Sequence, residues 1–470
     1  MQITPLTVGP IVGEITPTTV RLWGRAEVEK APSGIRRCFG IVRIWPAGNR
    51  AAMLPVQYFK MNPNFDMTGV SVFTGLKAET SYEYQMGWFF SELELEEVTV
   101  LPVTDQDWSE VPGHKFSTAA SRKDRSRSFV FGSCRYLLRL FGGLWTDSRG
   151  DKTFRSILDQ INQDGIQTDH LLMLGDQIYA DDLNILHFDE TVDEYNARYR
   201  EAFSQPHIRA LMSQVSTYMT LDDHEIEDGW PAHSTDKDWI IKYPAAIHAY
   251  QTYQMSHSPV LDITGNRIEG TPRRFWYTAQ NGCCDFFVTD TRTERRLGEN
   301  PEIISKEQMQ NLKEWLDDKS GRVKFIVSSV PLFPATKSSN EDKWGGFPAQ
   351  QSELLDFLWS KQVPRVVFLA GDVHSALSAE LVEQNDPLGY KVASVVSSSF
   401  YWPYPHNSRR AFDLDGKIQS ATSANVYQVV NPGDVCDTDN FTRITVTLSK
   451  MQVDVFGRKG NLLSSRTIEF

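Results

Sequence analysis

The chain has 470 residues, a length that predicts two or three domains. Its 40% apolar and 23% charged residues are typical of a folded globular protein and exclude a disordered or membrane-embedded one. The formal net charge of −12 argues against broad binding of the nucleic-acid backbone, which needs clustered lysine and arginine. It does not argue against phosphate substrates, because bound cations can reverse the field inside a pocket.

The first residues and the cysteines bear on the compartment. The segment MQITPLTVGPIVGE lacks the basic and apolar parts of a secretory signal. No stretch approaches the roughly 20 apolar residues of a membrane-spanning helix. The five cysteines form neither a disulfide framework nor a zinc-binding spacing. The sequence therefore predicts a cytoplasmic protein, or an exported one if a leader has been removed.

Residues 1–118 have the pattern of an all-β domain. The strand-like runs are TVRLWGRAEV, FGIVRIWP and SYEYQMGWFF, and alternation in the last one places Tyr82, Tyr84, Met86 and Trp88 on one face. A turn, TGLKAET, precedes this aromatic strand, as in immunoglobulin-like and fibronectin-III sandwiches. We therefore predict an immunoglobulin-like β-sandwich over this range.

Residues 119–128 are polar and charged and include the run ASRKDRSRS. Without apolar anchors, this segment has the composition of a solvated linker. The alternative is a basic patch that binds a partner. We predict the linker.

Residues 129–470 alternate between strand and helix patterns. Helical spacing of apolar residues occurs at 154–161, and Ser305 followed by Gln308 predicts a capping box that opens another helix. At the end of the chain, FTRITVTL and KMQVDVFG alternate and are separated by a short turn near Ser449. We therefore predict an α/β domain that closes with a β-hairpin.

Four short apolar runs, typical of buried strands, end in residues that bind metals. SFVFGSCR ends near Cys134, HLLMLGDQIY at Asp176 and Tyr179, TYMTLDDHE at Asp222, Asp223 and His224, and RVVFLAGDVH at Asp372 and His374. In open α/β sheets, ligands bind outside the carboxyl ends of the strands. The sequence therefore predicts a polynuclear metal site at these strand ends.

Each motif alone has a simpler interpretation. Asp176 after a strand can cap the next helix, and Asp222 and Asp223 can form a solvated turn beside a structural histidine. Together the motifs favour a metal site, because so many ligand residues at strand ends rarely coincide by chance. Tyr179 fits such a site, since a tyrosine phenolate is a hard anionic donor that suits Fe(III). Asp372 and His374 also lie two apart, on the same side of an extended strand end.

The order of the motifs, SC, GDxIY, DDHE and GDxH, resembles the alkaline phosphatase D (PhoD-like) group of the calcineurin-type metallophosphoesterase superfamily. DTR at 290–292 is similar to a strand-end segment of that family, and EDKWGGFP at 341–348 resembles its WDG-containing loop, with Gly345 in place of the usual Asp. The resemblance covers nearly the whole chain, including the N-terminal sandwich. It implies a four-layer α/β/β/α phosphoesterase core for residues 129–470 and a β-rich C-terminus.

The resemblance also implies roles for individual residues. Metal ligands would be Cys134, Asp176 and Tyr179 at an iron-like position, Asp223 at a second metal, and Asp372 and His374 in place of the superfamily's GHxH. His224 would be the general acid or transition-state donor. Arg135 is a weaker candidate, as a contact to a phosphoryl oxygen. Asp181 and Asp182 are candidate ligands or helix caps, and we favour caps. The implied metals are Fe(III) and Ca(II), with Mn, Zn and Mg as alternatives.

The predicted function is hydrolysis of phosphate mono- or diesters by a metal-activated hydroxide, with His224 protonating or stabilising the leaving oxygen. Cys134 is then a ligand and not a nucleophile. We expect a small-molecule or lipid phosphate ester as substrate and no nucleic acid as a stable partner. The alternatives are a phospholipase D-like phosphodiesterase, an amide or carboxyl-ester hydrolase, and an inactive phosphate- or partner-binding module. The aromatic segment 397–406 either rims the pocket or packs on the core.

Overall fold

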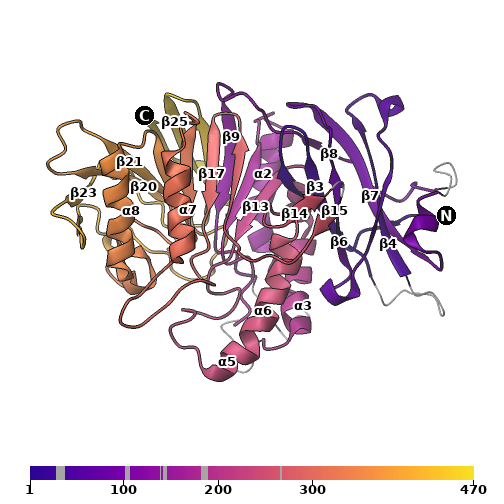
Figure 1. Cartoon of the computed structure of the whole chain (residues 1–470), viewed down its shortest axis with the longest axis horizontal. Helices are drawn as coiled ribbons and strands as arrows, with labels where there is room; N and C mark the ends of the chain where they lie inside the picture. Colours follow the sequence, from indigo (N-terminus) through magenta and orange to yellow (C-terminus); the bar gives the residue numbers. More distant parts are fainter. Residues whose placement is uncertain (28–36, 101–105, 138, 141–144, 182–188, 265–266) are drawn as a thin grey trace.

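The computed structural model describes residues 1–27, 37–100, 106–137, 139–140, 145–181, 189–264 and 267–470 (Figure 1). None of the helices in these ranges is long and apolar enough to cross a membrane.

The N-terminal part consists of two antiparallel sheets, as the alternating pattern predicts. One contains β1 (Thr4–Pro5), β4 (Arg37–Pro46), β5 (Gln57–Lys60), β7 (Ser81–Ser91) and β8 (His114–Ser117), and the other contains β2 (Val8–Ile15), β3 (Val20–Arg25) and β6 (Thr68–Phe73). Tyr82, Tyr84, Met86 and Trp88 of β7 are all buried in the core between the sheets, so the predicted face is confirmed. The short helix α1 (Leu95–Val98) follows β7.

The smaller N-terminal sheet packs against the rest of the molecule. Val8, Ile11 and Trp23 belong to the same hydrophobic core as the central strands. The Trp23 indole N–H donates to the carbonyl of Thr252 at 3.0 Å, and the Tyr84 hydroxyl donates to the carbonyl of Ser213 at 2.7 Å. The N-terminal sheets are therefore docked through a shared core.

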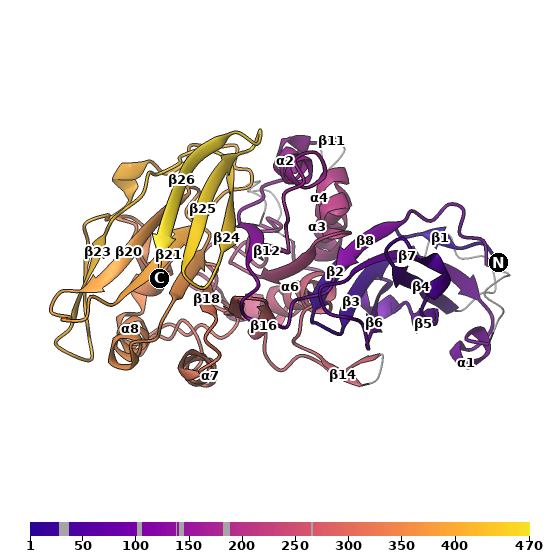
Figure 2. The ribbon, with the colours of Figure 1, turned by 90° about the horizontal axis from the view of Figure 1, so that it is seen from above.

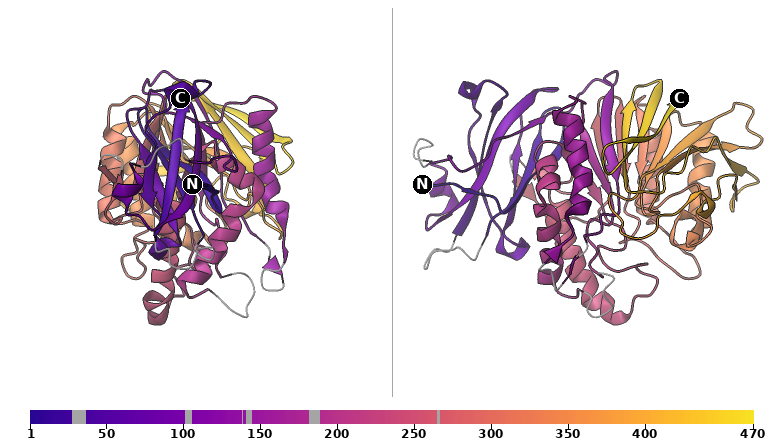
Figure 3. Two further views of the ribbon diagram at one scale, coloured as in Figure 1. Left: turned by 90° about the vertical axis from the view of Figure 1, so that its right-hand side faces the viewer. Right: turned by 180° about the vertical axis from the view of Figure 1, so that it is seen from behind.

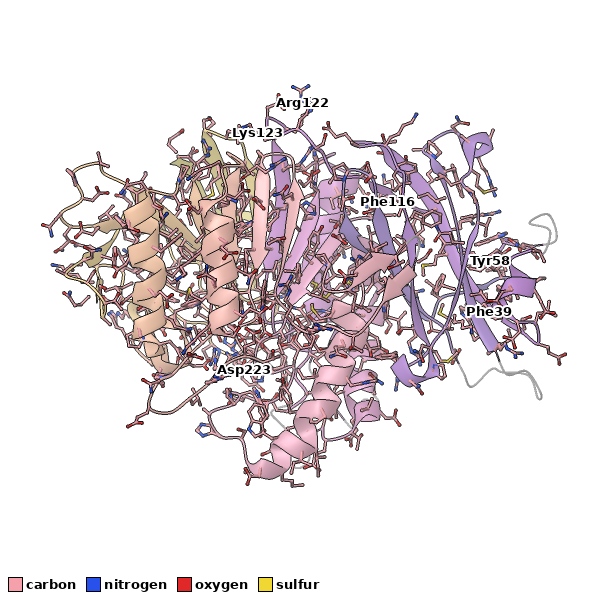
Figure 4. All side chains as sticks on the ribbon, in the orientation of Figure 1. Phe39, Tyr58, Phe116, Arg122, Lys123 and Asp223 are labelled. Atoms are coloured by element: carbon pink, nitrogen blue, oxygen red, sulfur yellow. The ribbon has the colours of Figure 1, made fainter. Side chains whose placement is uncertain are left out.

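The predicted linker is solvated only in its middle part. Residues 121–126 are exposed, whereas Ala120 is buried and its N–H donates to Asn281 Oδ1 at 2.8 Å. Arg127 and Ser128, predicted as linker, are already part of β9. Figure 4 places Arg122 and Lys123 at the opposite end of the central strands from Asp223.

Two mixed sheets form the centre of the remaining chain. The first has the order β13-β12-β9-β24-β25-β26 and the second β16-β17-β18-β19-β21-β20-β23-β22. The strands of the first are β9 (Arg127–Gly132), β12 (His170–Leu174), β13 (Ser216–Thr220), β24 (Asn440–Val446), β25 (Lys450–Gly457) and β26 (Leu462–Glu469). Those of the second are β16 (Tyr277–Asn281), β17 (Cys284–Val288), β18 (Val323–Val327), β19 (Val366–Ala370), β20 (Leu377–Glu383), β21 (Lys391–Val396), β22 (Lys417–Gln419) and β23 (Val426–Val430). The predicted C-terminal hairpin is β24–β25, and β26 extends it to three strands.

Helices lie on both sides of the pair of sheets, although β25 and β26 have no helix over them (Figure 2). On one side are α2 (Asp151–Asn162), α3 (Val192–Ser204) and α4 (Pro206–Met212), which appear in magenta in the rear view of Figure 3, and on the other are α7 (Lys306–Asp317) and α8 (Pro348–Lys361). The remaining elements are α5 (Asp236–Ile240) at the lower edge in Figure 1, α6 (Lys242–Tyr250), the π-helix η6 (Gln251–Met255) and the hairpin of β14 (Asp262–Thr264) and β15 (Arg267–Glu269). Ser305 caps α7 by accepting from the Gln308 N–H, but the Gln308 side chain bonds Asp290 and Glu294, so the reciprocal half of the predicted capping box is wrong.

Aromatic rings join the two sheets. The ring of Phe129 lies 5.3 Å from that of Phe286 and 5.2 Å from that of Phe325. Phe287, the next residue on β17, instead faces the core beneath α7 and α8, because successive side chains of a strand point to opposite faces. Since β9, β12 and β13 run parallel, as do β17, β18, β19 and β21, the carboxyl ends of each group lie at one edge of their sheet.

We predict that Phe129→Ala lowers the free energy of unfolding by about 3–5 kcal/mol, because it leaves a cavity between the sheets. Urea denaturation followed by circular dichroism measures the change. Leu462→Ala is the control, since Leu462 is 55% exposed and should cost little. A loss below about 1 kcal/mol for the Phe129 variant would contradict this account of the core.

Candidate metal centre

The ends of β9, β12 and β13 bring predicted site residues together. The Cys134 thiol donates to Asp176 Oδ2 at 3.2 Å, and the Tyr179 hydroxyl lies 3.4 Å from the same oxygen. Asp176, Asp223 and His224 each offer one ligand atom, and these atoms all lie within 4.8 Å of one another. Three of the sequence motifs therefore meet at one point.

The backbone is strained at four predicted ligands. The backbone φ angles are 55° at Cys134, 56° at Asp176, 69° at Asp372 and 48° at His374. Residues other than glycine rarely adopt such positive φ angles. Such conformations cost of order 1–3 kcal/mol each and cluster at functional sites. The turns after β9, β12 and β19 thus hold their side chains in unusual directions.

The glycines before two of the aspartates allow the loops to approach closely. A Cβ at Gly175 would lie 2.5 Å from the Asp222 Cβ, and a Cβ at Gly371 would lie 2.3 Å from Ser133 Oγ. Gly175 also has a φ of 97°. The GD pairs of the sequence therefore serve packing between strand ends as well as ligand placement.

A pocket of about 480 Å³ opens onto these side chains. Asp176, Asp223, His224, Asp372 and His374 are among its lining residues. Cys134 and Tyr179 lie behind this surface and are almost completely buried. The candidate metal-binding side chains therefore lie on two sides of one centre, some on the pocket surface and some in the protein interior.

The donor atoms fit a bound cation. Asp176 Oδ1 and Asp222 Oδ2 are buried and have no hydrogen-bond partner in the part of the chain that the structure describes. Burial raises the pKa of the Cys134 thiol well above its usual value, and the nearby carboxylates of Asp176 and Asp372 raise it further. A positive charge at this point would satisfy the carboxylate oxygens and favour the thiolate.

Asp222 and Asp223 are adjacent but do different things. Arg292 donates through Nε to Asp222 Oδ1, and Ser329 Oγ donates to the same oxygen at 2.9 Å. Asp342 accepts from Arg292 at 2.8 and 3.0 Å, so this guanidinium is fixed between two carboxylates. Asp222 is therefore part of the support, whereas Asp223 lines the pocket.

Sequence reasoning assigned no role to Glu225, although it holds the ligand loops together. Its carboxylate accepts from the backbone N–H groups of Asp176 at 3.0 Å, Gln177 at 2.7 Å and Asp222 at 2.8 Å. Gln254 Nε2 adds a bond at 3.3 Å from the π-helix. One buried side chain thus joins the turns after β12 and β13.

The structure corrects the interpretation of Asp181 as a helix cap. Both of its oxygens lie 2.9 Å from His224 Nδ1, and one also accepts from the Asp228 N–H. Burial lowers the pKa of His224, but the carboxylates of Asp223, Asp176 and Asp181 outweigh it and hold that pKa well above its usual value. Asp181 therefore orients the histidine. Asp182 lies outside the described residues.

Lys343 is a further pocket residue without a predicted role, and it belongs to the segment EDKWGGFP. Its Nζ lies 2.7 Å from Asp372 Oδ2. The neighbouring His374 ring stacks on Trp402 with centroids 3.9 Å apart. Burial lowers the pKa of His374 to about 3, and the nearby His224 contributes to this shift.

The aromatic segment 397–406 packs on the core and beside the candidate centre, and its residues are not among those that line the pocket. Phe400 and Tyr401 are buried in the core. Trp402 packs on His374 and lies 5.8 Å from the Tyr179 ring, and Tyr404 is 44% exposed. The segment thus anchors itself by two rings and supports the centre with a third.

The position of Arg135 is inconsistent with the predicted contact to substrate. Its side chain is 1% exposed, donates to the carbonyl of Ala202 at 2.7 Å and lies over the ring of Phe154. The side chain that follows Cys134 therefore points into the helical layer. Its role is packing of α2 and α3 beneath the centre.

Comparisons with known proteins agree with the motifs. Residues 144–455 match the family model described as PhoD-like phosphatase. The curated alkaline phosphatase D of Bacillus subtilis (strain 168) is 24% identical over 235 residues, which are 41% of this chain and 36% of that protein. A solved structure described as "Structure of PhoD" is similar in fold, with a TM-score of 0.73 at 17% identity, and the match covers 99% of this chain and 89% of that one.

We predict that Asp176→Asn lowers metal affinity at least tenfold while the fold is kept, because the amide preserves shape and removes the central charge. Metal content after equilibrium dialysis, measured by mass spectrometry, gives the change. Asp164→Asn is the control, since Asp164 is exposed. Wild-type metal content in the Asp176 variant would show that the cation binds elsewhere.

Glu225→Gln should lower the free energy of unfolding by about 1–3 kcal/mol, because an amide nitrogen would then face a backbone N–H donor. Urea titration of the metal-free protein measures this directly. Glu299→Gln, at an exposed position, provides the matched control. If both variants unfold at the wild-type urea concentration, Glu225 does not join the two loops.

Proposed function

We propose that this protein, which belongs to the family of PhoD-like phosphatases, is a metal-dependent phosphoesterase. The observation that carries the proposal is that the side chains of Asp176, Asp223 and His224 converge within 4.8 Å of one another in the lining of a pocket. The two carboxylates would be metal ligands, and the imidazole would be the proton donor beside them. Buried carboxylate oxygens without hydrogen-bond partners in the described chain support it. So does the presence of Cys134 and Tyr179 on the protein side of the same centre.

The fold assignment belongs to the same proposal. Residues 129–470 would form a four-layer α/β/β/α metallophosphoesterase domain, supported by the two sheets packed through Phe129 and the helices on both sides of this pair. Residues 1–118 would form an immunoglobulin-like sandwich, supported by two antiparallel sheets around one core. Residues 119–126 would connect the two, since Arg127 and Ser128 belong to β9.

The donor types support the assignment of the first metal. Cys134, Asp176 and Tyr179 would hold Fe(III), because phenolate and carboxylate are anionic donors that suit this ion. Asp223, Asp372 and His374 would hold the second ion, for which we propose Ca(II), with Mn, Zn and Mg as alternatives. When bound, such cations neutralise phosphoryl oxygens and lower the pKa of water from about 16 toward 7.

The chain's own side chains would do the remaining work. With Nδ1 of His224 bonded to Asp181, the Nε2 nitrogen is left to give a proton to the leaving oxygen of the ester. Lys343 lines the pocket beside Asp372 and would contact a phosphoryl oxygen. The Cys134 side chain lies behind the pocket wall, which supports a role as ligand and argues against covalent catalysis.

The test is hydrolysis of 4-nitrophenyl phosphate and bis(4-nitrophenyl) phosphate by protein loaded with Fe(III) and Ca(II). We expect turnover that falls at least a hundredfold in Asp176→Asn and in His374→Ala, and that Asp164→Asn leaves unchanged. Release of 4-nitrophenolate is followed by absorbance. Equal turnover in wild type and either site variant would contradict the site assignment. If the wild type hydrolyses neither ester, the inactive binding module is favoured.

A further inference from the structure

A second pocket, of about 950 Å³, adjoins the candidate metal centre and is called the side pocket below. Pro231, Arg295 and Leu297 line both pockets, so the side pocket lies directly beside the pocket of the candidate metal centre. The remaining walls of the side pocket come from α5, from the loop after β17 and from the start of α7. A substrate bound at the metal centre can therefore extend into the side pocket.

Trp239 of α5 forms an exposed aromatic platform in the side pocket. Its ring is 40% exposed, and its other contacts are Trp230 and Tyr243, with centroids 4.8 and 4.9 Å away. Trp230 and Tyr243 are themselves stacked, and the Trp239 indole N–H donates to Ser234 Oγ at 3.0 Å. The ring is thus held in place before any ligand arrives, which lowers the entropic cost of stacking.

The charges of the side pocket indicate what kind of group it takes. Its cationic residues are Arg295, Arg296 and Lys306, and its acidic residues are Glu294, Glu302 and Glu307. Because the positive and negative charges are equal in number, the pocket would attract a second phosphate or another polyanion only weakly. An uncharged group with a flat ring, which can stack on Trp239 and contact Leu297, fits better.

Arg295 stands where the two pockets join. Its side chain is 2% exposed and is fixed by Asp342 at 2.6 Å and by the carbonyl of Thr291 at 2.9 Å. Its Nη2 has no hydrogen-bond partner in the described part of the chain. A rigid guanidinium at this junction favours a substrate whose negative charge stays near the metal centre and whose uncharged part lies beyond it.

We propose that the side pocket receives the second alcohol group of a phosphodiester, and that this group carries a ring that stacks on Trp239. The inference rests on the proposed phosphoesterase function and concerns the group beyond the phosphorus, which a monoester lacks. In the reaction, water adds to phosphorus and the bond to the leaving alcohol breaks. The leaving oxygen takes a proton, and the phosphomonoester of the ring-bearing alcohol remains.

Three diesters with one leaving group test the proposal: methyl 4-nitrophenyl phosphate, phenyl 4-nitrophenyl phosphate and thymidine 5′-(4-nitrophenyl phosphate). For the metal-loaded wild type, we expect kcat/KM at least about tenfold higher for a ring-bearing ester than for the methyl ester. Trp239→Ala should remove most of this ratio. Ile240→Ala is the matched control, because Ile240 lies on the same helix, is 74% exposed and does not line either pocket.

A ratio that is the same in Trp239→Ala and wild type would overturn the inference and leave the phosphoesterase function intact. If no ester is hydrolysed, the proposed function fails, and calorimetric titration with the same three esters then decides about the pocket. If the wild type binds the ring-bearing esters more tightly than the methyl ester and Trp239→Ala removes this difference, the role of the side pocket is supported. Equal binding of all three esters by the wild type would overturn the inference. Thymidine and phenyl esters distinguish a nucleoside from a simple aryl group.

Discussion

The structure depends on one constraint, which is the repulsion between carboxylates that lie close together at one edge of two sheets. Asp176, Asp223 and Asp372 repel one another, and burial strengthens the repulsion because the protein interior screens charge less than water does. Arg292 and Lys343 offset part of it by pairing with Asp222 and Asp372. What remains has the sign and location that a bound cation would neutralise.

The support around the centre follows from the same constraint. A loop that carries an acidic ligand must be fixed by groups that are themselves satisfied, since a mobile carboxylate would turn to water. Glu225 does this by accepting backbone N–H groups from two loops, and Asp181 does it for His224. The positive φ angle at Asp176 is tolerated because the bond from its N–H group to Glu225 helps to fix the turn.

The sequence predicts the strands and the placement of the candidate ligands at their ends, because both depend on local patterns. Short apolar runs before Cys134, Asp176 and Asp372 identify buried strands, and parallel pairing then brings their ends together. Long-range contacts leave no such pattern. Asp181 meets a histidine 43 positions away, and Arg292 meets an aspartate 70 positions away. The predicted contact of Arg135 with the substrate rests only on its position after Cys134. Neighbouring residues in a turn can point in opposite directions, so this reasoning is insufficient.

The docking of the small N-terminal sheet has a consequence for the architecture as a whole. Val8, Ile11 and Trp23 complete a hydrophobic core that also contains the strands of the metal centre. Trp23 bonds the carbonyl of Thr252, two residues before the glutamine that contacts Glu225. The amino-terminal sheets therefore form one wall of the core that carries the candidate site. A fragment cut between them and the remaining chain would expose an apolar flank, so the two parts depend on each other for folding.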